Sequence, residues 1–435
     1  MGRYVVNSPA EQQEMLAQLG LNSLDELYSS VPETARCAEL KIPAGLSELE
    51  VSRRLAALAS ENRVFPVIFR GAGAYNHFIP AIVKSVTAKE QFVTTYTPYQ
   101  AEISQGVLQS IFEYQTQICE LTGMDAANAS VYDGAVAAAE AMFMTLARNR
   151  NRILVGGTID PQVLQVVKTY AESRNVEISV ISPKDGQTDL EELKEQLSPD
   201  VAGLLVQSPN YYGILENTDE IAKLAHDNGS KFILSANPIV YGLLRSAGEQ
   251  GADIAVGEGQ PLGMPLSFGG PYLGYMACRQ DLMRKLPGRI VGETTDKAGR
   301  RCYVLTLQAR EQHIRREKAA SNICSNEALC AMTASVYLAA MGPSGLHKVA
   351  ENSASLAHYM LKRLKEAGFR LRYDQEFFNE FLADSPVDID RLEAALAAKG
   401  ILSGLKVNGG LLLCTTEMNT KADIEAFLAT VKEVA

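Results

Sequence analysis

Short apolar runs alternate with helix-like stretches from about residue 105 onward. Apolar residues recur at helical spacing over 107–123 and 134–149, whereas five short apolar runs are bounded by turn residues. These runs are RILVGG at 152–157, EISVIS at 177–182, VAGLLVQSP at 201–209, KFILSAN at 231–237 and ADIAVGE at 252–258. Strands that alternate with helices in this way predict a mostly parallel sheet covered on both faces. Ligand sites are then expected at the carboxyl ends of the strands.

The same pattern divides the chain into three predicted parts. Residues 1–100 are expected to form an N-terminal helical arm and linker. SPAEQQEML at 8–16 and GLSELEVSRRLAALASEN at 45–62 each combine a capping residue with acidic residues and an apolar stripe. Residues 101–340 carry the alternating elements of a large α/β domain. Residues 341–435 alternate short strands with helices, so we expect a smaller C-terminal α+β domain.

Composition and charge narrow the class of protein. Of the 435 residues, 46% are hydrophobic and 21% are charged, which is the balance of an ordinary globular protein. The formal net charge of -10 argues against a nucleic-acid or anionic-membrane partner, because both favour clustered basic residues. Seven cysteines without a CxxC pair predict a reducing compartment and no structural zinc. No apolar run of about 18 residues occurs, so a cytoplasmic location is expected.

Two positions test whether the chain could hold pyridoxal phosphate. In enzymes of the aspartate-aminotransferase fold that use this cofactor, one strand of the sheet usually ends in an aspartate that pairs with the pyridine nitrogen. The run at 231–237 is the corresponding strand in this chain. The candidate position here is Leu234, and its neighbour Ser235 carries no charge. The cofactor-bearing lysine would follow the strand at 252–258, where Gln260 or Pro261 stands. Neither residue can form an imine, so the chain is not expected to hold the cofactor in its own pocket.

Several polar and aromatic stretches are candidates for function. TTYTPYQAEISQG at 94–106 gathers polar and aromatic side chains before a helix, and this composition favours function over structure: Tyr96, Thr97, Tyr99, Gln100, Glu102. His77 follows a turn-rich stretch and is expected to be a hydrogen-bonded structural residue. Asp133 precedes an alanine-rich helix. It either simply caps the helix or caps it while free backbone N–H groups form an anion site. Tyr211 and Tyr212 either line a pocket or pack together on a loop.

Five motifs together resemble the P-protein of the glycine cleavage system, a glycine dehydrogenase (decarboxylating). They are TTYTPYQAEISQG, ELTGMDAANASVYDGA, QSPNYYG, GQPLGMPLSFGGPYLG and RREKAASNICSNEALCA, and they are spread over nearly the whole chain. This family exists either as one chain of two related halves or as two subunits. With 435 residues that match the N-terminal half, the chain resembles subunit 1 of the split form. Val136 departs from the threonine or serine expected in many relatives, which weakens an anion-binding role for that helix start.

The resemblance implies an aspartate-aminotransferase-like fold and a site shared with a partner. In this family the other half, or glycine dehydrogenase subunit 2, carries the lysine, the aspartate and hence pyridoxal phosphate, so no cofactor is expected on this chain itself. The loop with Tyr96, Tyr99, Gln100 and Glu102 is then expected to close the partner's pocket over the substrate, glycine. The backbone around Ser267, Gly269 and Gly270 is a candidate contact for the partner cofactor's phosphate.

The implied reaction is the decarboxylation of glycine and transfer of the aminomethyl group to the lipoyl arm of the H-protein. The chain is not expected to catalyse it alone. One alternative is a non-catalytic scaffold or regulatory paralogue of a pyridoxal-phosphate enzyme. Another is an autonomous enzyme that uses an unconventional lysine such as Lys231.

Overall fold

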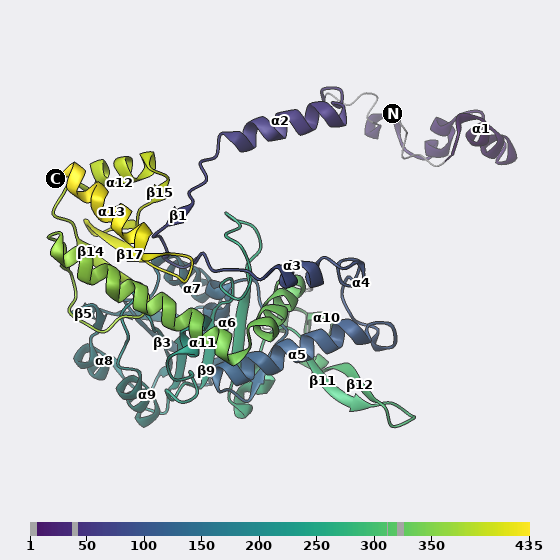
Figure 1. The fold of residues 1–435 in the computed structure, drawn as a ribbon. Coiled ribbons are helices and arrows are strands. Elements are labelled where there is room, and N and C mark those ends of the chain that lie inside the picture. The colour runs from purple at the N-terminus through teal and green to yellow at the C-terminus, as the bar shows by residue number, and fades with distance from the viewer. Residues whose placement is uncertain (1–6, 37–41, 311, 320–325) are drawn as a thin grey trace. The chain divides into compact units, whose positions relative to one another are not determined.

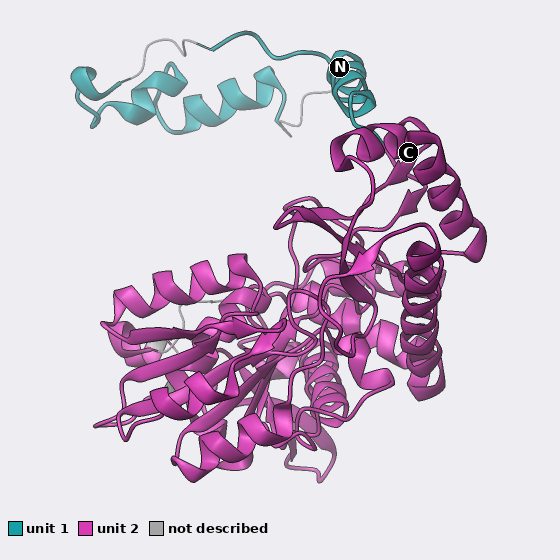
Figure 2. Ribbon diagram, turned by 90° about the vertical axis from the view of Figure 1, so that its left-hand side faces the viewer, with its two compact units in different colours: residues 1–63 teal, residues 64–435 magenta. Residues whose placement is uncertain are grey.

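The computed structural model describes residues 7–36, 42–310, 312–319 and 326–435. The chain divides into two compact units, residues 1–63 and 64–435 (Figure 2). In the first unit, both predicted helices are confirmed as α1 (Pro9–Gln18) and α2 (Glu48–Ser60). Each begins with a capping box, formed by Ser8 with Glu11 and by Ser47 with Glu50. Two short 3₁₀ turns lie between them, η1 (Leu24–Tyr28) and η2 (Glu33–Ala35).

A seven-stranded sheet forms the centre of the second unit (Figure 1). Its spatial order is β2 (Ala126–Ala127), β10 (Gly274–Cys278), β9 (Ile254–Glu258), β8 (Lys231–Ser235), β7 (Val201–Gln207), β3 (Arg152–Gly156) and β4 (Glu177–Ile181). The strands from β9 to β4 pair in parallel, and β10 pairs antiparallel with β9 and β2. All five predicted strands are confirmed. The mostly parallel α/β fold predicted from the sequence is also confirmed.

Helices cover both faces of this sheet, and each face has its own apolar core. On one face the core includes Tyr114 of α5 (Gln105–Thr122) and Ile221 of α9 (Thr218–Asp227). On the other it includes Met142 of α6 (Gly134–Thr145) and Val167 of α7 (Pro161–Ser173). Neighbouring residues of one strand enter opposite cores, which explains the continuous apolar runs. Shorter elements of this region are α3 (Ala81–Thr87), α4 (Glu90–Val93), η3 (Ala101–Ile103), α8 (Leu190–Gln196), η4 (Pro238–Gly242), η5 (Gln280–Lys285), β5 (Pro183–Lys184) and β6 (Gln187–Thr188).

Two further structures extend from this sheet region. A hairpin of β11 (Ile290–Thr295) and β12 (Arg301–Thr306) reaches away from the sheet in Figure 1, and its base packs on α5. It is followed by the short turns η6 (Gln308–Arg310), α10 (Gln312–Arg315) and η7 (Arg316–Lys318). The long helix α11 (Ala328–Glu366) then leads to the C-terminal part, and Gly342 breaks it with φ 61° and ψ 178°. Among the described residues, α11 is long and apolar enough to cross a membrane, but residues of both its halves belong to the protein's apolar cores.

The C-terminal part is a four-stranded antiparallel sheet with helices. The strands are β13 (Arg370–Leu371), β14 (Glu380–Asp384), β17 (Gly410–Cys414) and β16 (Leu405–Val407), and the helices are α12 (Ile389–Ala398) and α13 (Lys421–Val434). The chain segment that enters the second unit joins this part first, because β1 (Val67–Ile68) pairs with β15 (Ile401–Leu402). Phe69 lies in the apolar core of the C-terminal part, together with Leu411 of β17 and Ile424 of α13. The segment at 70–80 therefore runs from the C-terminal part to the large sheet.

Candidate functional site

A cavity of about 620 Å³ lies where ligand sites were expected, at the carboxyl ends of the parallel strands. Asp160 follows β3, Gln207 ends β7, Ser235 ends β8 and Glu258 ends β9, and all four residues line the cavity. The rest of the wall comes from the start of α6, the segments at 72–75 and 269–272, and residues 378–380. This position agrees with the general rule that open α/β sheets bind ligands at the carboxyl ends of their strands.

The segment at 71–78 covers the cavity and is fastened from two sides. The side-chain amide of Gln260 bonds both backbone groups of Tyr75, since Oε1 accepts from its N and Nε2 donates to its O, each at 2.9 Å. From β14, the carboxyl of Glu380 accepts from the backbone N of Ala72 at 2.8 Å and from the Tyr75 hydroxyl at 3.1 Å. Burial raises the pKa of Glu380 to about 7. The large sheet and the C-terminal part thus hold the same segment.

A carboxyl of the chain itself occupies the start of α6. Asp133 caps the helix, accepting from the backbone N of Val136 at 2.7 Å, so capping is confirmed. The carboxyl of Glu258 accepts from the backbone N of Gly134 at 3.0 Å and also from those of Gln260 and Leu273. A side chain at Gly134 would lie within 2.6 Å of the Glu258 backbone, so the close approach requires glycine. Burial raises the pKa of Glu258 to about 7.

These residues do not fit pyridoxal phosphate. A helix start in this position would bind the phosphate through free N–H groups, but here carboxyls of the chain accept from those of Gly134 and Val136. Among the described residues that line the cavity, none is a lysine. Lys231 lies at the amino end of β8, where it pairs with Asp253 and Asp281. Lys285 donates to backbone carbonyls at the end of α6.

The two positions singled out for the missing cofactor groups lie in different surroundings. Leu234 is fully buried in the core that includes Tyr114, on the sheet face away from α6. Ser235 is the β8 residue that lines the cavity, because adjacent strand residues face opposite ways. Gln260 is also fully buried, and Nε2 donates additionally to the carbonyl of Met264 at 2.8 Å. Its amide is therefore part of the structure that holds the cavity wall.

The loop at 96–102 combines exposed side chains with a contact from Tyr99 to Arg289. Tyr96 is 82% exposed, Gln100 and Glu102 are exposed, and Thr97 is half-buried. The hydroxyl of Tyr99 accepts from Nη2 of Arg289 at 2.9 Å, and the guanidinium carbon lies 4.8 Å from the Tyr99 ring centre. Arg289 was not identified from the sequence. Arg289 and Tyr99 are brought together by the fold of the chain between them, and no local sequence pattern indicates such a contact.

The loop at 265–272 projects with little support. Phe268 is 95% exposed and has a φ of 46°, and Gly269 and Gly270 are exposed while lining the cavity. The N of Gly270 donates to the carbonyl of Ser267 at 2.9 Å, so this donor is used within the turn. Ser267 is half-buried, and its hydroxyl donates to the carbonyl of Pro265.

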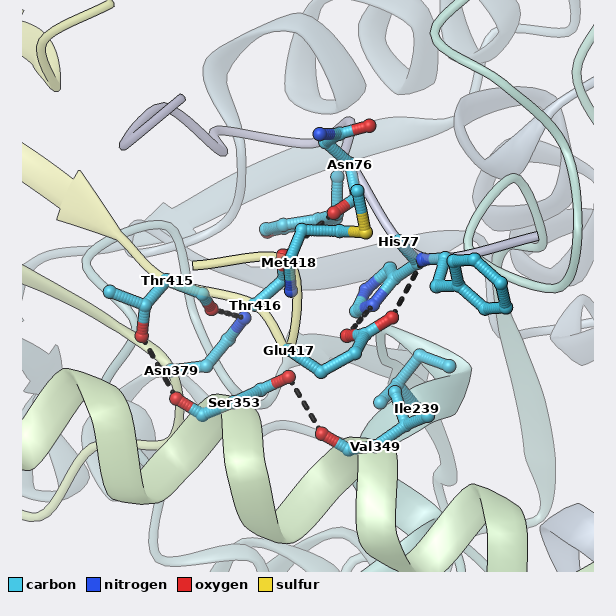
Figure 3. Close-up of polar contacts among 12 residues, drawn as sticks. Asn76, His77, Ile239, Val349, Ser353, Asn379, Thr415, Thr416, Glu417 and Met418 are labelled. Carbon is cyan, nitrogen blue, oxygen red and sulfur yellow. Dashed lines mark hydrogen bonds and ion pairs between the residues drawn. The ribbon is translucent and has the colours of Figure 1, made fainter. Parts of the chain in front are cut away.

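His77 is a hydrogen-bonded structural residue, as expected from the sequence. Its Nδ1 lies 2.7 Å from one oxygen of Glu417, whose other oxygen accepts from the backbone N of Phe78 at 2.7 Å (Figure 3). The hydroxyl of Thr416 donates to the carbonyl of Asn76 at 2.7 Å. These bonds join the covering segment to the loop after β17. Tyr211 and Tyr212 pack on each other, and Tyr212 also packs on Tyr373, which agrees with the second of the two expectations.

Comparisons with known proteins agree with the motifs. The family described as "Glycine cleavage system P-protein" matches residues 2–431. Proteins named "Probable glycine dehydrogenase (decarboxylating) subunit 1" from Desulfitobacterium hafniense and Syntrophomonas wolfei are 48% and 49% identical. The alignments cover 99% and 98% of this chain and the same shares of the relatives.

Solved structures show the same fold. A crystal structure of "glycine decarboxylase (P-protein) of the glycine cleavage system, in inhibitor-bound form" matches with a TM-score of 0.94 and 39% identity, over 100% of both chains. A sphingosine-1-phosphate lyase from Burkholderia pseudomallei matches with a TM-score of 0.65 at 14% identity, covering 94% of each chain. The aspartate-aminotransferase-like fold expected from the resemblance is thus confirmed.

Proposed function

Since this chain belongs to the glycine cleavage system P-protein family, we propose that it is the subunit of a heteromeric glycine decarboxylase that does not itself hold pyridoxal phosphate. The observation that carries the proposal is the carboxyl of Glu258 at the start of α6, where the phosphate would have to lie. The absence of a lysine among the described lining residues supports it. The cofactor and its lysine then belong to glycine dehydrogenase subunit 2.

The loops at 96–102 and 265–272 are the proposed contribution to the partner's site. Each presents an exposed aromatic side chain, since Tyr96 and Phe268 are 82% and 95% exposed. Enzymes of this fold place active sites between subunits, so exposed aromatic side chains on these loops would suit the partner's surface. Tyr99, which accepts a hydrogen bond from Arg289, would close the site over glycine. Gly269 and its neighbours would approach the partner's cofactor phosphate.

The proposed reaction is decarboxylation of glycine with transfer of the aminomethyl group to the lipoyl arm of the H-protein. When bound to the partner, pyridoxal phosphate supplies the electron sink for loss of CO₂. The part of this chain would be to exclude water from the substrate carboxylate, which favours a charge-dispersed transition state. The H-protein would have to reach the same site.

A glycine–bicarbonate exchange assay tests this function. It contains H-protein and pyridoxal phosphate and compares this chain alone, subunit 2 alone and the mixture. We expect exchange only in the mixture. Full exchange by subunit 2 alone would support the scaffold alternative, and exchange by this chain alone would support an autonomous enzyme. Either result would overturn the proposal.

A further inference from the structure

The cavity that does not fit the cofactor has a strongly acidic wall. Asp160, Glu258 and Glu380 reach it from three different elements, and Asp133 lines it at the start of α6. Among the described lining residues, none is a lysine, arginine or histidine. A concave site with low-dielectric walls concentrates the field of the charges on it. When these carboxyls are ionised, no basic side chain of the described wall balances their charge.

The carboxyls are close enough to affect one another. Burial is the largest cause that raises the pKa of Glu380, and the neighbouring charge of Asp160 raises it further. Burial likewise raises the pKa of Glu258, and the charge of Asp133 adds to that effect. A positive charge placed among these groups would favour their ionised forms. The wall is thus arranged to attract a cation.

Two side-chain oxygens of the wall accept no hydrogen bond within the described part of the chain. Ser235 is only 7% exposed, and its hydroxyl has no hydrogen bond there. Asn379 is 4% exposed, and its Nδ2 donates to the carbonyl of Thr415 at 3.0 Å, while Oδ1 accepts from no group among the described residues. Both side chains line the cavity, so a ligand there could reach them. Both oxygens can accept hydrogen bonds from a ligand.

The size and the ligand set favour an organic cation over a metal ion. A cavity of about 620 Å³ falls in the range of small-molecule sites. Within the described ranges, no group of three or more His, Cys, Asp and Glu side chains is arranged to hold a metal ion. A molecule with several donors could satisfy carboxyl, hydroxyl and amide oxygens at once.

We propose that this cavity binds a small organic molecule that carries a protonated amine. The ammonium group lies among the carboxyls of Asp160 and Glu380, and further donors of the ligand meet Ser235 and Asn379. This site lies in the chain's own cavity and is additional to its role at the partner's site. The bound amine would connect the covering segment, through Glu380, with the ends of β3 and β8.

Calorimetric titration of the full-length chain tests the proposal with three molecules of similar size. Ethanolammonium, ethylene glycol and glycolate differ mainly in charge, and titration at about pH 8 keeps the carboxyls largely ionised. We expect binding of ethanolammonium only. Binding of the glycol or of glycolate as tightly as ethanolammonium, or no binding of ethanolammonium, would overturn the proposal. The chain is titrated alone, so the result does not depend on the exchange activity.

Matched variants locate the ligand. Asp160→Asn retains a residue that can cap α7, and Glu380→Gln retains the shape of the side chain. Each is expected to weaken ethanolammonium binding at least about tenfold. The control is Asp388→Asn, which changes the cap of α12 in the same way but lies outside the cavity wall. Undiminished binding by the Asp160→Asn/Glu380→Gln double variant would contradict the assignment.

Discussion

Gln260 bonds the N and the O of Tyr75 through a single side-chain amide, with both distances at 2.9 Å. Its Nε2 also donates to Met264, so the amide joins the loop after β9 to the segment that covers the cavity. A lysine at this position could not accept from the backbone N of Tyr75. The residue that stands near the expected lysine position thus stabilises the structure of the cavity.

Removal of this amide is expected to destabilise the chain. Gln260→Ala leaves two backbone groups of Tyr75 and one of Met264 without partners in a buried place, so the free energy of unfolding should fall by about 2–4 kcal/mol. Urea denaturation measures the change. Gln165→Ala serves as control, because that side chain is exposed on α7 and should change stability by less than about 0.5 kcal/mol. Equal effects of the two variants would contradict the role of Gln260.

Tyr99 is expected to matter for turnover in the assembled enzyme. Tyr99→Ala removes the ring held by Arg289, and we expect the exchange rate with subunit 2 to fall about ten- to a hundredfold because closure of the site is lost. Tyr359→Ala is the matched control, since its hydroxyl also bonds a charged group, Glu425, but lies between α11 and α13. An unchanged exchange rate for Tyr99→Ala would show that Tyr99 does not contribute to the partner's active site.

Glu140 should make stability depend on pH. It is buried in α6, its Oε2 has no partner among the described residues, and burial raises its pKa to about 7 against the opposing charge of Arg174. The folded state therefore keeps a proton that the unfolded chain releases at lower pH, and this contribution to stability is lost as pH rises from about 5 to 7.

Glu140→Gln should abolish that contribution. Relative to the parent chain, we expect the free energy of unfolding to be higher by about 1–3 kcal/mol at about pH 8 and nearly unchanged at about pH 5. Urea denaturation at the two pH values gives the comparison, and exposed Glu195→Gln is the control. A difference that is the same at both pH values would show that titration of Glu140 is not its cause.

Phe268 is expected to bind the partner without supporting the fold. Because its side chain is 95% exposed, Phe268→Glu should leave stability unchanged but raise the Kd for subunit 2 by about 30-fold, as loss of an aromatic anchor does. Sedimentation velocity of mixtures gives the Kd. Val64→Glu, at a residue that is 86% exposed, should have little effect. If both variants associate like the parent chain, the loop is not part of the interface.

The sequence predicted the elements whose pattern is local. Each of the five apolar runs contains a strand of the sheet, and the runs are most continuous in strands buried on both faces, such as β7. A run that is apolar on both faces does not show which face of the sheet each residue occupies. The sequence therefore could not indicate that Ser235, and not Leu234, lines the cavity. The antiparallel strand β10 and the β11–β12 hairpin were not predicted.

The missing cofactor lysine was visible from the sequence, but its structural replacement was not. Glu258 meets Gly134 across 124 residues of chain, and Gln260 meets Tyr75 across 185. Such contacts follow from the order of strands in the sheet and leave no periodic signal. The domain boundaries predicted at 100 and 340 and the partner contacts predicted for Tyr96, Ser267 and their neighbours stay predictions.

The central claim is that this chain leaves pyridoxal phosphate to its partner, and an absorbance spectrum tests it most directly. The full-length chain and subunit 2 are each incubated with the cofactor, freed of excess by gel filtration and scanned. We predict that this chain lacks a band between roughly 400 and 430 nm, whereas subunit 2 or the mixture shows one. A band from this chain alone that survives gel filtration, and is converted by borohydride into a pyridoxyl-lysine found by mass spectrometry, would contradict the account.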